Sequence, residues 1–173
     1  MDQNTHTLSI LVNNEPGVLM RVINLFTRRG YNIDSLSVSV TEDPEISRIT
    51  IVVSATNAQY VEQIERQIEK LIDVIRVYEM PQGTSLQREL VLVKVFANEQ
   101  TRHSIIELCE IFKAKIVDVS ATTMTAQIVG EDNRVSNFLD LMKQYGICEM
   151  VRTGMTAMER GPRTLAEMEY QEI

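Results

Sequence analysis

The sequence predicts an α+β protein made of two tandem ferredoxin-like βαββαβ domains. Hydrophobic patterns of period two and period 3.6 alternate in this order along the first 80 residues, and the same order starts again after a Pro- and Gly-containing stretch. We therefore expect a first domain at residues 5–80, a linker at 81–86, a second domain at 87–160 and a tail at 161–173.

The first domain has a clear pattern for each of its six elements. Apolar and mostly polar residues alternate from Thr7 to Val12, which predicts a strand with one buried face. The helix that follows has its apolar stripe at residues 19–26 and ends at Gly30, where a left-handed residue is favoured. The remaining predicted elements are strands at 36–40, 49–53 and 74–80 and a helix at 61–71.

The second domain repeats this order with little sequence identity to the first. Its predicted elements are strands at 90–96, 115–120, 124–129 and 147–152 and helices at 105–112 and 135–142. The tail from Gly161 to Ile173 is polar and has no strand pattern. We expect it to be disordered or to form a short, frayed helix at 165–170.

Composition and charge exclude several classes of protein. Hydrophobic residues make up 44% and charged residues 24%, as in an ordinary globular chain. The formal net charge is -7 and the longest basic run is Arg28-Arg29, which argues against a nucleic-acid partner. The N-terminus does not resemble a secretory signal, and no apolar run could span a membrane. We expect a cytoplasmic protein.

Metal and catalytic motifs are missing from the sequence. Cys109 and Cys148 are far apart and have apolar neighbours, so we expect two buried, reduced thiols and no metal site. His6 and His103 are isolated, and no common catalytic motif is present. Four carboxylates interleave with basic residues at helical spacing, which predicts a solvated helix face with i,i+4 pairs rather than an acid–base dyad. They are Glu62, Glu65, Glu69 and Asp73.

The turn at residues 13–18 is the most informative segment. It joins the first strand to the first helix, whose opening N–H groups have no partner within the helix and favour negative charge. Gly17 has no Cβ, so a ligand can approach the main chain closely, and Asn14 offers both a donor and an acceptor. The turn therefore suits a carboxylate. By itself, it is better explained as a helix cap followed by a turn residue, because such caps are common.

Two segments together resemble a known family. Asn-Glu-Pro-Gly-Val-Leu at 14–19 and Arg-Gly-Tyr-Asn-Ile-Asp-Ser-Leu at 29–36 are similar to the amino-acid-binding ACT domain. More closely, they resemble the small regulatory subunits of acetolactate synthase (acetohydroxyacid synthase). Further similar segments include Asp-Val at 73–74, Arg-Glu-Leu at 88–90 and Ile-Val-Asp-Val at 116–119. The resemblance covers about residues 5–162.

The resemblance implies a homodimeric subunit with no catalytic residue and no cofactor of its own. Such a subunit activates the large catalytic subunit and makes it sensitive to feedback inhibition, usually by valine, at the head of branched-chain amino acid synthesis. Thiamine diphosphate, Mg²⁺ and FAD belong to the catalytic partner.

The resemblance also implies where the effector binds. The amides that open the first helix should hold its carboxylate, and the loop at 32–33 of the neighbouring protomer should close the pocket. The expected effector site is Asn14, Gly17, Val18, Leu19, Asn32 and Ile33. The corresponding turn of the second half, at 97–100, has neither Gly nor Pro, so we expect no amino-acid site there.

Two other functions remain open at this point. The chain could be an ACT-domain sensor for a different biosynthetic enzyme or a transcription regulator. It could also be a stand-alone enzyme on the same scaffold, such as an acylphosphatase. An acylphosphatase needs a positive residue at its phosphate loop, whereas this turn offers Glu15 and no arginine before Arg21.

Overall fold

The computed structural model describes residues 5–55, 58–81 and 83–167 and divides the chain into two compact units. Unit 1 consists of the chain up to Gln87 together with the segment from Met155 onward, and unit 2 is Arg88–Gly154. The expected boundary at residue 160 differs from this division, because the chain returns to unit 1 after Gly154.

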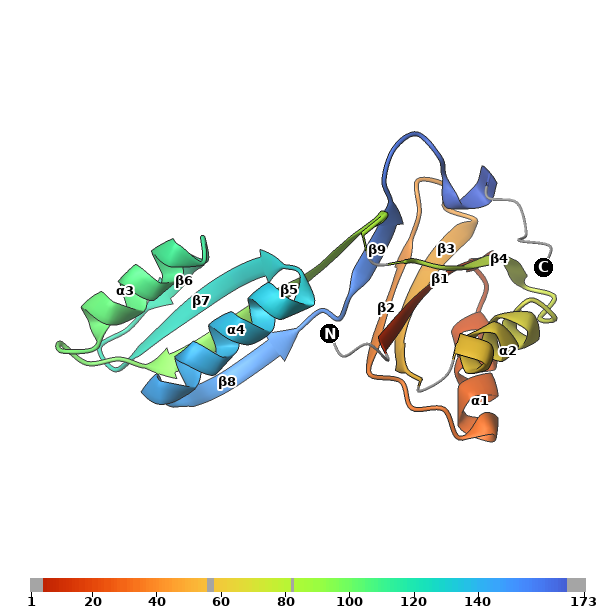
Figure 1. The fold of residues 1–173 in the computed structure, drawn as a ribbon. Coiled ribbons are helices and arrows are strands. Elements are labelled where there is room, and N and C mark those ends of the chain that lie inside the picture. The colour runs from red at the N-terminus through yellow and green to blue at the C-terminus, as the bar shows by residue number, and fades with distance from the viewer. Residues whose placement is uncertain (1–4, 56–57, 82, 168–173) are drawn as a thin grey trace. The chain divides into compact units, whose positions relative to one another are not determined.

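Unit 1 has the βαββαβ order that the sequence predicts. Its four-stranded antiparallel sheet has the strand order β2-β3-β1-β4, and the two helices cover one face of that sheet (Figure 1). The elements are β1 (Thr5–Asn13), α1 (Val18–Arg29), β2 (Ser35–Val40), β3 (Ile46–Ser54), α2 (Ala58–Ile68) and β4 (Val74–Glu79).

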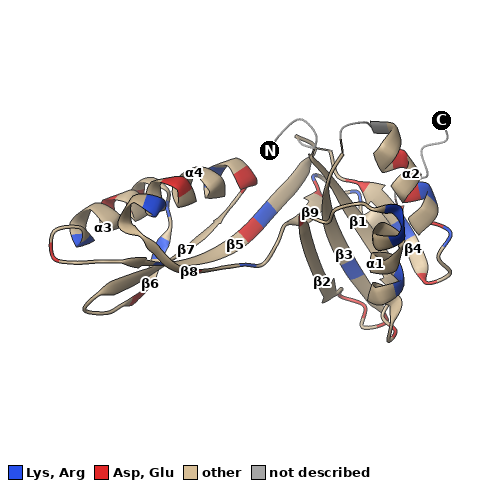
Figure 2. Ribbon diagram, turned by 90° about the horizontal axis from the view of Figure 1, so that it is seen from below, with Lys and Arg blue, Asp and Glu red and all other residues tan. Residues whose placement is uncertain are grey.

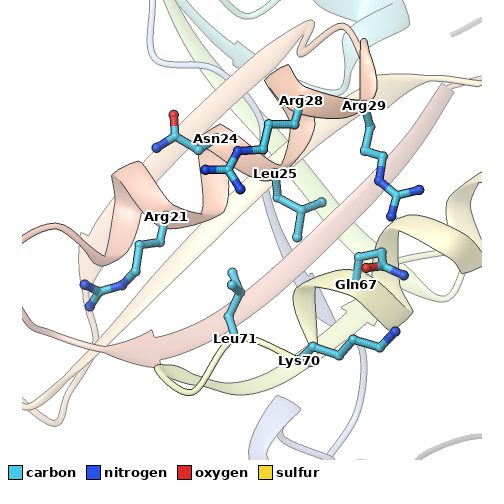
Figure 3. A pocket seen from close by; sticks show the side chains of 8 residues that line it. All are labelled: Arg21, Asn24, Leu25, Arg28, Arg29, Gln67, Lys70 and Leu71. Carbon is cyan, nitrogen blue, oxygen red and sulfur yellow. The ribbon is translucent and has the colours of Figure 1, made fainter.

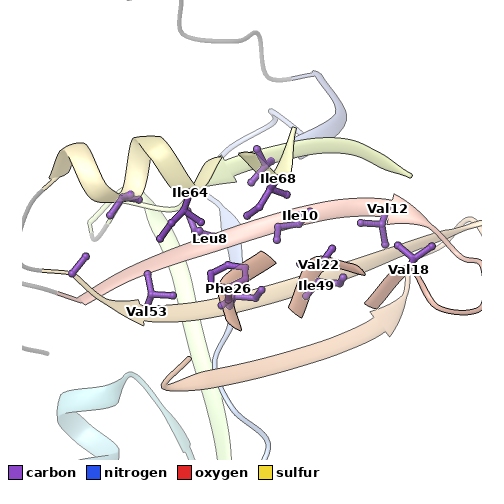
Figure 4. Close-up of a cluster of buried hydrophobic side chains, with 14 residues drawn as sticks. Leu8, Ile10, Val12, Val18, Val22, Phe26, Ile49, Val53, Ile64 and Ile68 are labelled. Carbon is purple, nitrogen blue, oxygen red and sulfur yellow. The ribbon is translucent and has the colours of Figure 1, made fainter. Parts of the chain in front are cut away.

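The main core of unit 1 lies between this sheet and its helices (Figure 4). Alternate residues of β1 and β3 point toward the helices, and Val22 and Phe26 of α1 and Ile64 of α2 pack against them with almost no exposed surface. This packing fixes the rotation of α1 about its axis. It therefore determines which side chains α1 presents on its two flanks.

The second face of the unit 1 sheet is also covered, contrary to the prediction that β1 has a single buried face. Two elements after unit 2 lie on it: the strand β9 (Thr156–Glu159) and the short 3-10 helix η2 (Leu165–Glu167). Leu165 packs with Leu11 and Met80, and Thr7 and Ser9 are buried. Of the two expectations for the tail, the short helix is observed at Leu165–Glu167, where Leu165 has an apolar surface to cover. Residues 168–173 lie outside the described residues.

Unit 2 repeats the βαββαβ order with the strand order β6-β7-β5-β8. Its own core lies between that sheet and two helices, and it includes Ile105, Phe138 and Met142. The elements are β5 (Ser85–Phe96), α3 (Arg102–Ile111), β6 (Lys115–Val119), β7 (Thr123–Gly130), α4 (Asp132–Met142), η1 (Lys143–Tyr145) and β8 (Ile147–Arg152). β5 begins at Ser85, inside the stretch at 81–86 that the sequence marks as a linker. The strand β9 pairs with β5.

The two cysteines differ in exposure. Cys109 of α3 is buried, as expected, and burial raises the pKa of its thiol to about 11. Cys148 is exposed, so the expectation of two buried thiols is wrong for this residue. It lies on the edge strand β8 at a register shift, where Val95 pairs with Ile147 and Lys94 with Glu149. Cys148 is therefore exposed even though its neighbour in sequence, Ile147, is apolar.

In the part of the chain that the structure describes, no helix has the length and apolarity to cross a membrane. The same residues contain no group of three or more His, Cys, Asp or Glu side chains placed to hold a metal ion.

Candidate functional site

The turn between β1 and α1 has the backbone conformation that only glycine adopts without strain. Gly17 immediately precedes α1, and its φ of 85° lies in the left-handed region. A Cβ at this position would find open space, with the Arg21 guanidinium 3.9 Å away as its nearest neighbour. Glycine is therefore required here by the left-handed backbone, and its missing side chain leaves the main chain exposed.

Several N–H groups at this turn have no partner. Val18 N–H donates only a long bond, of 3.3 Å, to the Glu15 carbonyl, and the first regular bond of the helix runs from Arg21 N–H to the Gly17 carbonyl at 3.0 Å. Within the described residues, the N–H groups of Gly17, Leu19 and Met20 make no hydrogen bond, and no side chain caps the helix. The opening of α1 thus offers unpaired donors where the helix dipole favours an anion.

Asn14 points away from α1 and ties the turn to the β2–β3 hairpin. Its amide nitrogen donates to the Pro44 carbonyl at 2.8 Å, and its amide oxygen accepts a bond of 3.0 Å from Ser47. Its backbone N–H donates to the Glu45 carbonyl at 2.7 Å. Asn14 is therefore not the cap of α1. It holds the turn rigid and leaves the helix amides uncovered.

Arg21 adds a positive charge that the sequence analysis did not assign to this site. One turn into α1, its guanidinium lies beside Gly17 and forms an ion pair of 2.7 Å with Asp73, whose side chain is 11% exposed. The spacing of four residues from Gly17 was the available sequence signal, because residues at i and i+4 share a helix face. Asp73, expected on a solvated helix face, is instead nearly buried.

The second predicted segment lies in the loop after α1. Gly30 ends α1 in the left-handed conformation, with a φ of 71°, as expected, and Tyr31 packs between Phe26 and Tyr60 at centroid distances of 6.3 and 5.0 Å. This packing anchors the loop and leaves Asn32 exposed, with its amide donating to Asp34 at 2.7 Å. Ile33 is half-buried against the core.

Within one chain, the two predicted segments do not meet. They flank opposite ends of α1, whose 12 residues span roughly 18 Å at 1.5 Å per residue. The turn at Gly17, with Val18 buried beneath it and Leu19 half-buried, therefore forms one group, and the loop at Asn32 forms another. A free amino acid is too small to touch both groups of the same chain.

The corresponding turn of unit 2 uses its amides differently. Asn98 occupies the place of Asn14, but its side-chain oxygen accepts hydrogen bonds from Gln100 N–H at 3.0 Å and Thr101 N–H at 2.9 Å. Asn14 cannot accept a bond that corresponds to the one from Gln100 N–H, because the equivalent residue in unit 1 is Pro16, which has no N–H. The N–H of Thr101, the residue just before α3, is thus bonded by the protein itself, whereas the N–H of Gly17, the residue just before α1, is available.

The acidic face predicted for α2 is only partly solvated. Arg66 and Glu62 form the expected exposed i,i+4 pair at 2.5 Å. Glu65, by contrast, is largely buried, which together with the nearby carboxylates of Glu79 and Glu69 raises its pKa from the ordinary 4.5 to about 7. The helical spacing correctly predicted that these carboxylates share one face of α2. Part of that face is covered by β4 and is therefore not solvated.

The two halves of the chain match two family models. Residues 8–76 match the AHAS small subunit-like ACT domain, and residues 88–161 match the model for the small subunit of acetolactate synthase. Over 156 residues, the chain is 49% identical to the probable acetolactate synthase small subunit of Archaeoglobus fulgidus, covering 90% of this chain and 97% of that protein. It is 46% identical over 159 residues to the acetolactate synthase small subunit of Mycolicibacterium smegmatis, covering 92% and 93% of the two chains.

A solved structure agrees with these sequence relationships. The crystal structure of the acetolactate synthase small subunit from Thermotoga maritima superposes on this chain with a TM-score of 0.83 at 38% identity. The match covers 92% of this chain and 99% of that one.

Proposed function

The chain belongs to the family of acetolactate synthase small subunits, and we propose from this that it is the valine sensor of its holoenzyme. In this proposal, it activates the large catalytic subunit and confers feedback inhibition by valine, which binds at the turn that opens α1. The reaction, with thiamine diphosphate, Mg²⁺ and FAD, takes place in the large subunit, and the complex works in the cytoplasm.

The observation that carries this proposal is the set of uncovered amides at Gly17. A carboxylate placed there would accept bonds from the N–H groups that open α1 and would lie near the Arg21 guanidinium. Leu19, half-buried on the neighbouring flank, would border the isopropyl group of valine. An anchor for the carboxylate beside an apolar wall is what recognition of an aliphatic amino acid requires.

We propose that two protomers complete the site. Since the loop at Asn32 lies at the far end of α1, it can serve the turn at Gly17 only from a second chain. The β2 edge supports such a contact, because this strand has no neighbour on its outer side within the described residues and carries Val38 and Val40 at 47% and 52% exposure. Effector bound at a subunit interface can shift the equilibrium between two dimer geometries, which is how binding would reach the catalytic partner.

The anchor is tested by replacing Gly17 with Asp and titrating valine calorimetrically. The new carboxylate would occupy or repel the position of the ligand's own carboxylate, so we expect valine binding to be lost. Gly161→Asp is the matched control: its φ of 84° almost equals that of Gly17, and a Cβ there would also enter open space. Equal loss of binding in both variants, or retained binding in Gly17→Asp, would contradict the anchor.

The shared site is tested by mixing two inactive variants. Gly17→Asp disables the turn and Asn32→Asp the loop, so neither homodimer should bind valine. If each site combines the turn of one protomer with the loop of the other, a mixed dimer contains one intact site. We therefore expect unfolding and refolding of the mixture to restore binding. No recovery, with mixed dimers verified by mass spectrometry, would exclude a shared site.

A further inference from the structure

A second feature of unit 1 is a basic hollow between the two helices, which shares Arg21 with the turn at Gly17. The hollow has a volume of about 430 Å³ and opens on the side of α1 and α2 that faces away from the sheet (Figure 3). None of its eight lining residues is acidic. Four of them are cationic: Arg21, Arg28, Arg29 and Lys70.

Most of this charge is not neutralised. Arg21 pairs with Asp73, but among the described residues no carboxylate lies within 4.0 Å of Arg28, Arg29 or Lys70. Figure 2 shows basic residues, coloured blue on the ribbon, along α1, in a protein whose net charge is -7. Like charges that converge on one hollow repel one another unless an anion lies between them.

Helix electrostatics alone do not explain this arrangement. Arg28 and Arg29 occupy the last turn of α1, where the helix dipole favours cations. That preference does not account for Lys70, which follows α2 and borders the same hollow from the other helix. Gln67 adds an amide donor on that side, and Leu25 and Leu71, which pack against the core, supply two fixed apolar side chains.

We propose that this hollow, defined by Arg28, Arg29 and Lys70, binds a small anion with several phosphate groups. Guanidinium groups match phosphate oxygens in a bidentate geometry, and an ammonium adds a point charge. The volume is within the range of known small-molecule sites. The hollow faces α2, whereas the half-buried Leu19 and Ile23 lie on the opposite flank of α1. The three cations that define the phosphate site do not include Arg21, so phosphate binding needs neither the valine site nor the proposed dimer contact.

The test is a calorimetric titration of the full chain with inorganic tripolyphosphate. We expect saturable binding that weakens by about tenfold or more in the double variant Arg28→Gln/Lys70→Gln, because this variant removes two of the three charges that define the site. The matched control is Arg160→Gln/Lys115→Gln, which removes the same charge from exposed positions elsewhere and should bind as the unchanged chain does.

Two outcomes would overturn the proposal. Equal weakening in both double variants would show a general charge effect instead of a site. Equally tight binding of citrate would show that the hollow does not select phosphate. Thermal unfolding of each variant, followed by circular dichroism, verifies that lost binding is not lost folding.

Discussion

Glu65 illustrates how one residue can depart from the pattern of its helix. Its carboxylate accepts a hydrogen bond from the Glu79 backbone, which lowers its pKa, but burial and the neighbouring carboxylates outweigh this effect and raise the pKa to about 7. The charged groups around it are Glu62 on α2, Glu69 just after α2, and Glu79 on β4, whose carboxylate is 2.6 Å from His6 on β1. An ionised Glu65 therefore opposes folding.

This shift predicts how stability depends on pH. The folded state holds the Glu65 proton more tightly than the unfolded state, so the free energy of unfolding should fall as pH rises from 4.5 to about 7. Glu65→Gln removes the ionisable carboxyl and therefore this loss of stability at higher pH. We expect the melting temperature of the variant, relative to the unchanged chain, to be higher at pH 8 than at pH 5. Glu62→Gln, which alters an exposed ion pair, should show little change between the two pH values. A pH-independent effect of Glu65→Gln would contradict the shifted pKa.

At the scale of elements, the segment after unit 2 is part of the unit 1 fold. The side chains of Ser35 and Ser37 on β2 bond to the backbone N–H and carbonyl of Met155 at 2.8 and 2.9 Å, and Arg48 of β3 bonds to the Ala157 carbonyl at 3.4 Å. Beyond β9, Leu165 completes a small apolar cluster with only 3% of its surface exposed. These bonds attach the returning chain to the sheet face opposite the helices.

Replacing Leu165 with alanine measures how much the segment after unit 2 contributes to the stability of unit 1. We expect Leu165→Ala to lower the free energy of unfolding by about 2 kcal/mol, the lower end of the range for a buried leucine, because the cluster is small. Ile72→Ala, at a side chain that is 94% exposed, should change it by less than about 0.5 kcal/mol. Urea denaturation followed by circular dichroism makes the comparison. Equal values for the two variants would show that the tail packs without stabilising unit 1.

At the scale of the whole molecule, two copies of one topology differ in how the first turn is hydrogen-bonded. Asn98 satisfies the amides of its own turn, whereas Asn14 bonds to the next hairpin and leaves the amides of α1 unpaired. Unit 2 therefore retains the fold with a different bonding pattern at this turn.

This difference predicts the stoichiometry. Calorimetry with valine should give one site per chain, because the N–H of Gly17 before α1 is unpaired within the described residues, whereas the corresponding N–H of Thr101 before α3 donates to Asn98. In a homodimer, the total would be two. A value of two sites per chain would mean that the Asn98 cap opens for ligand, and Asn98→Ala would then be expected to alter the second site alone.

The predicted elements and the observed ones agree closely where hydrophobic periodicity is strong. α1, with Val22 and Phe26 facing the core and Gly30 at its end, was readable from spacing alone. β9 was missed because its four residues carry no recognisable alternation, whereas the short helix expected at 165–170 is observed at Leu165–Glu167. The site residues were identified by resemblance, and their role as an effector site stays a prediction.

The sequence by itself determined the two βαββαβ units, the family, and a glycine at the opening of the first helix, because each of these depends on local pattern or local backbone geometry. Only the tertiary structure decided which sheet face the tail covers, which carboxylate of α2 is buried, and where the Asn14 side chain bonds. These outcomes depend on contacts between residues far apart in the chain, such as Asn14 with Ser47 and Leu11 with Leu165. Such contacts arise from the packing of whole elements, and no local pattern encodes them.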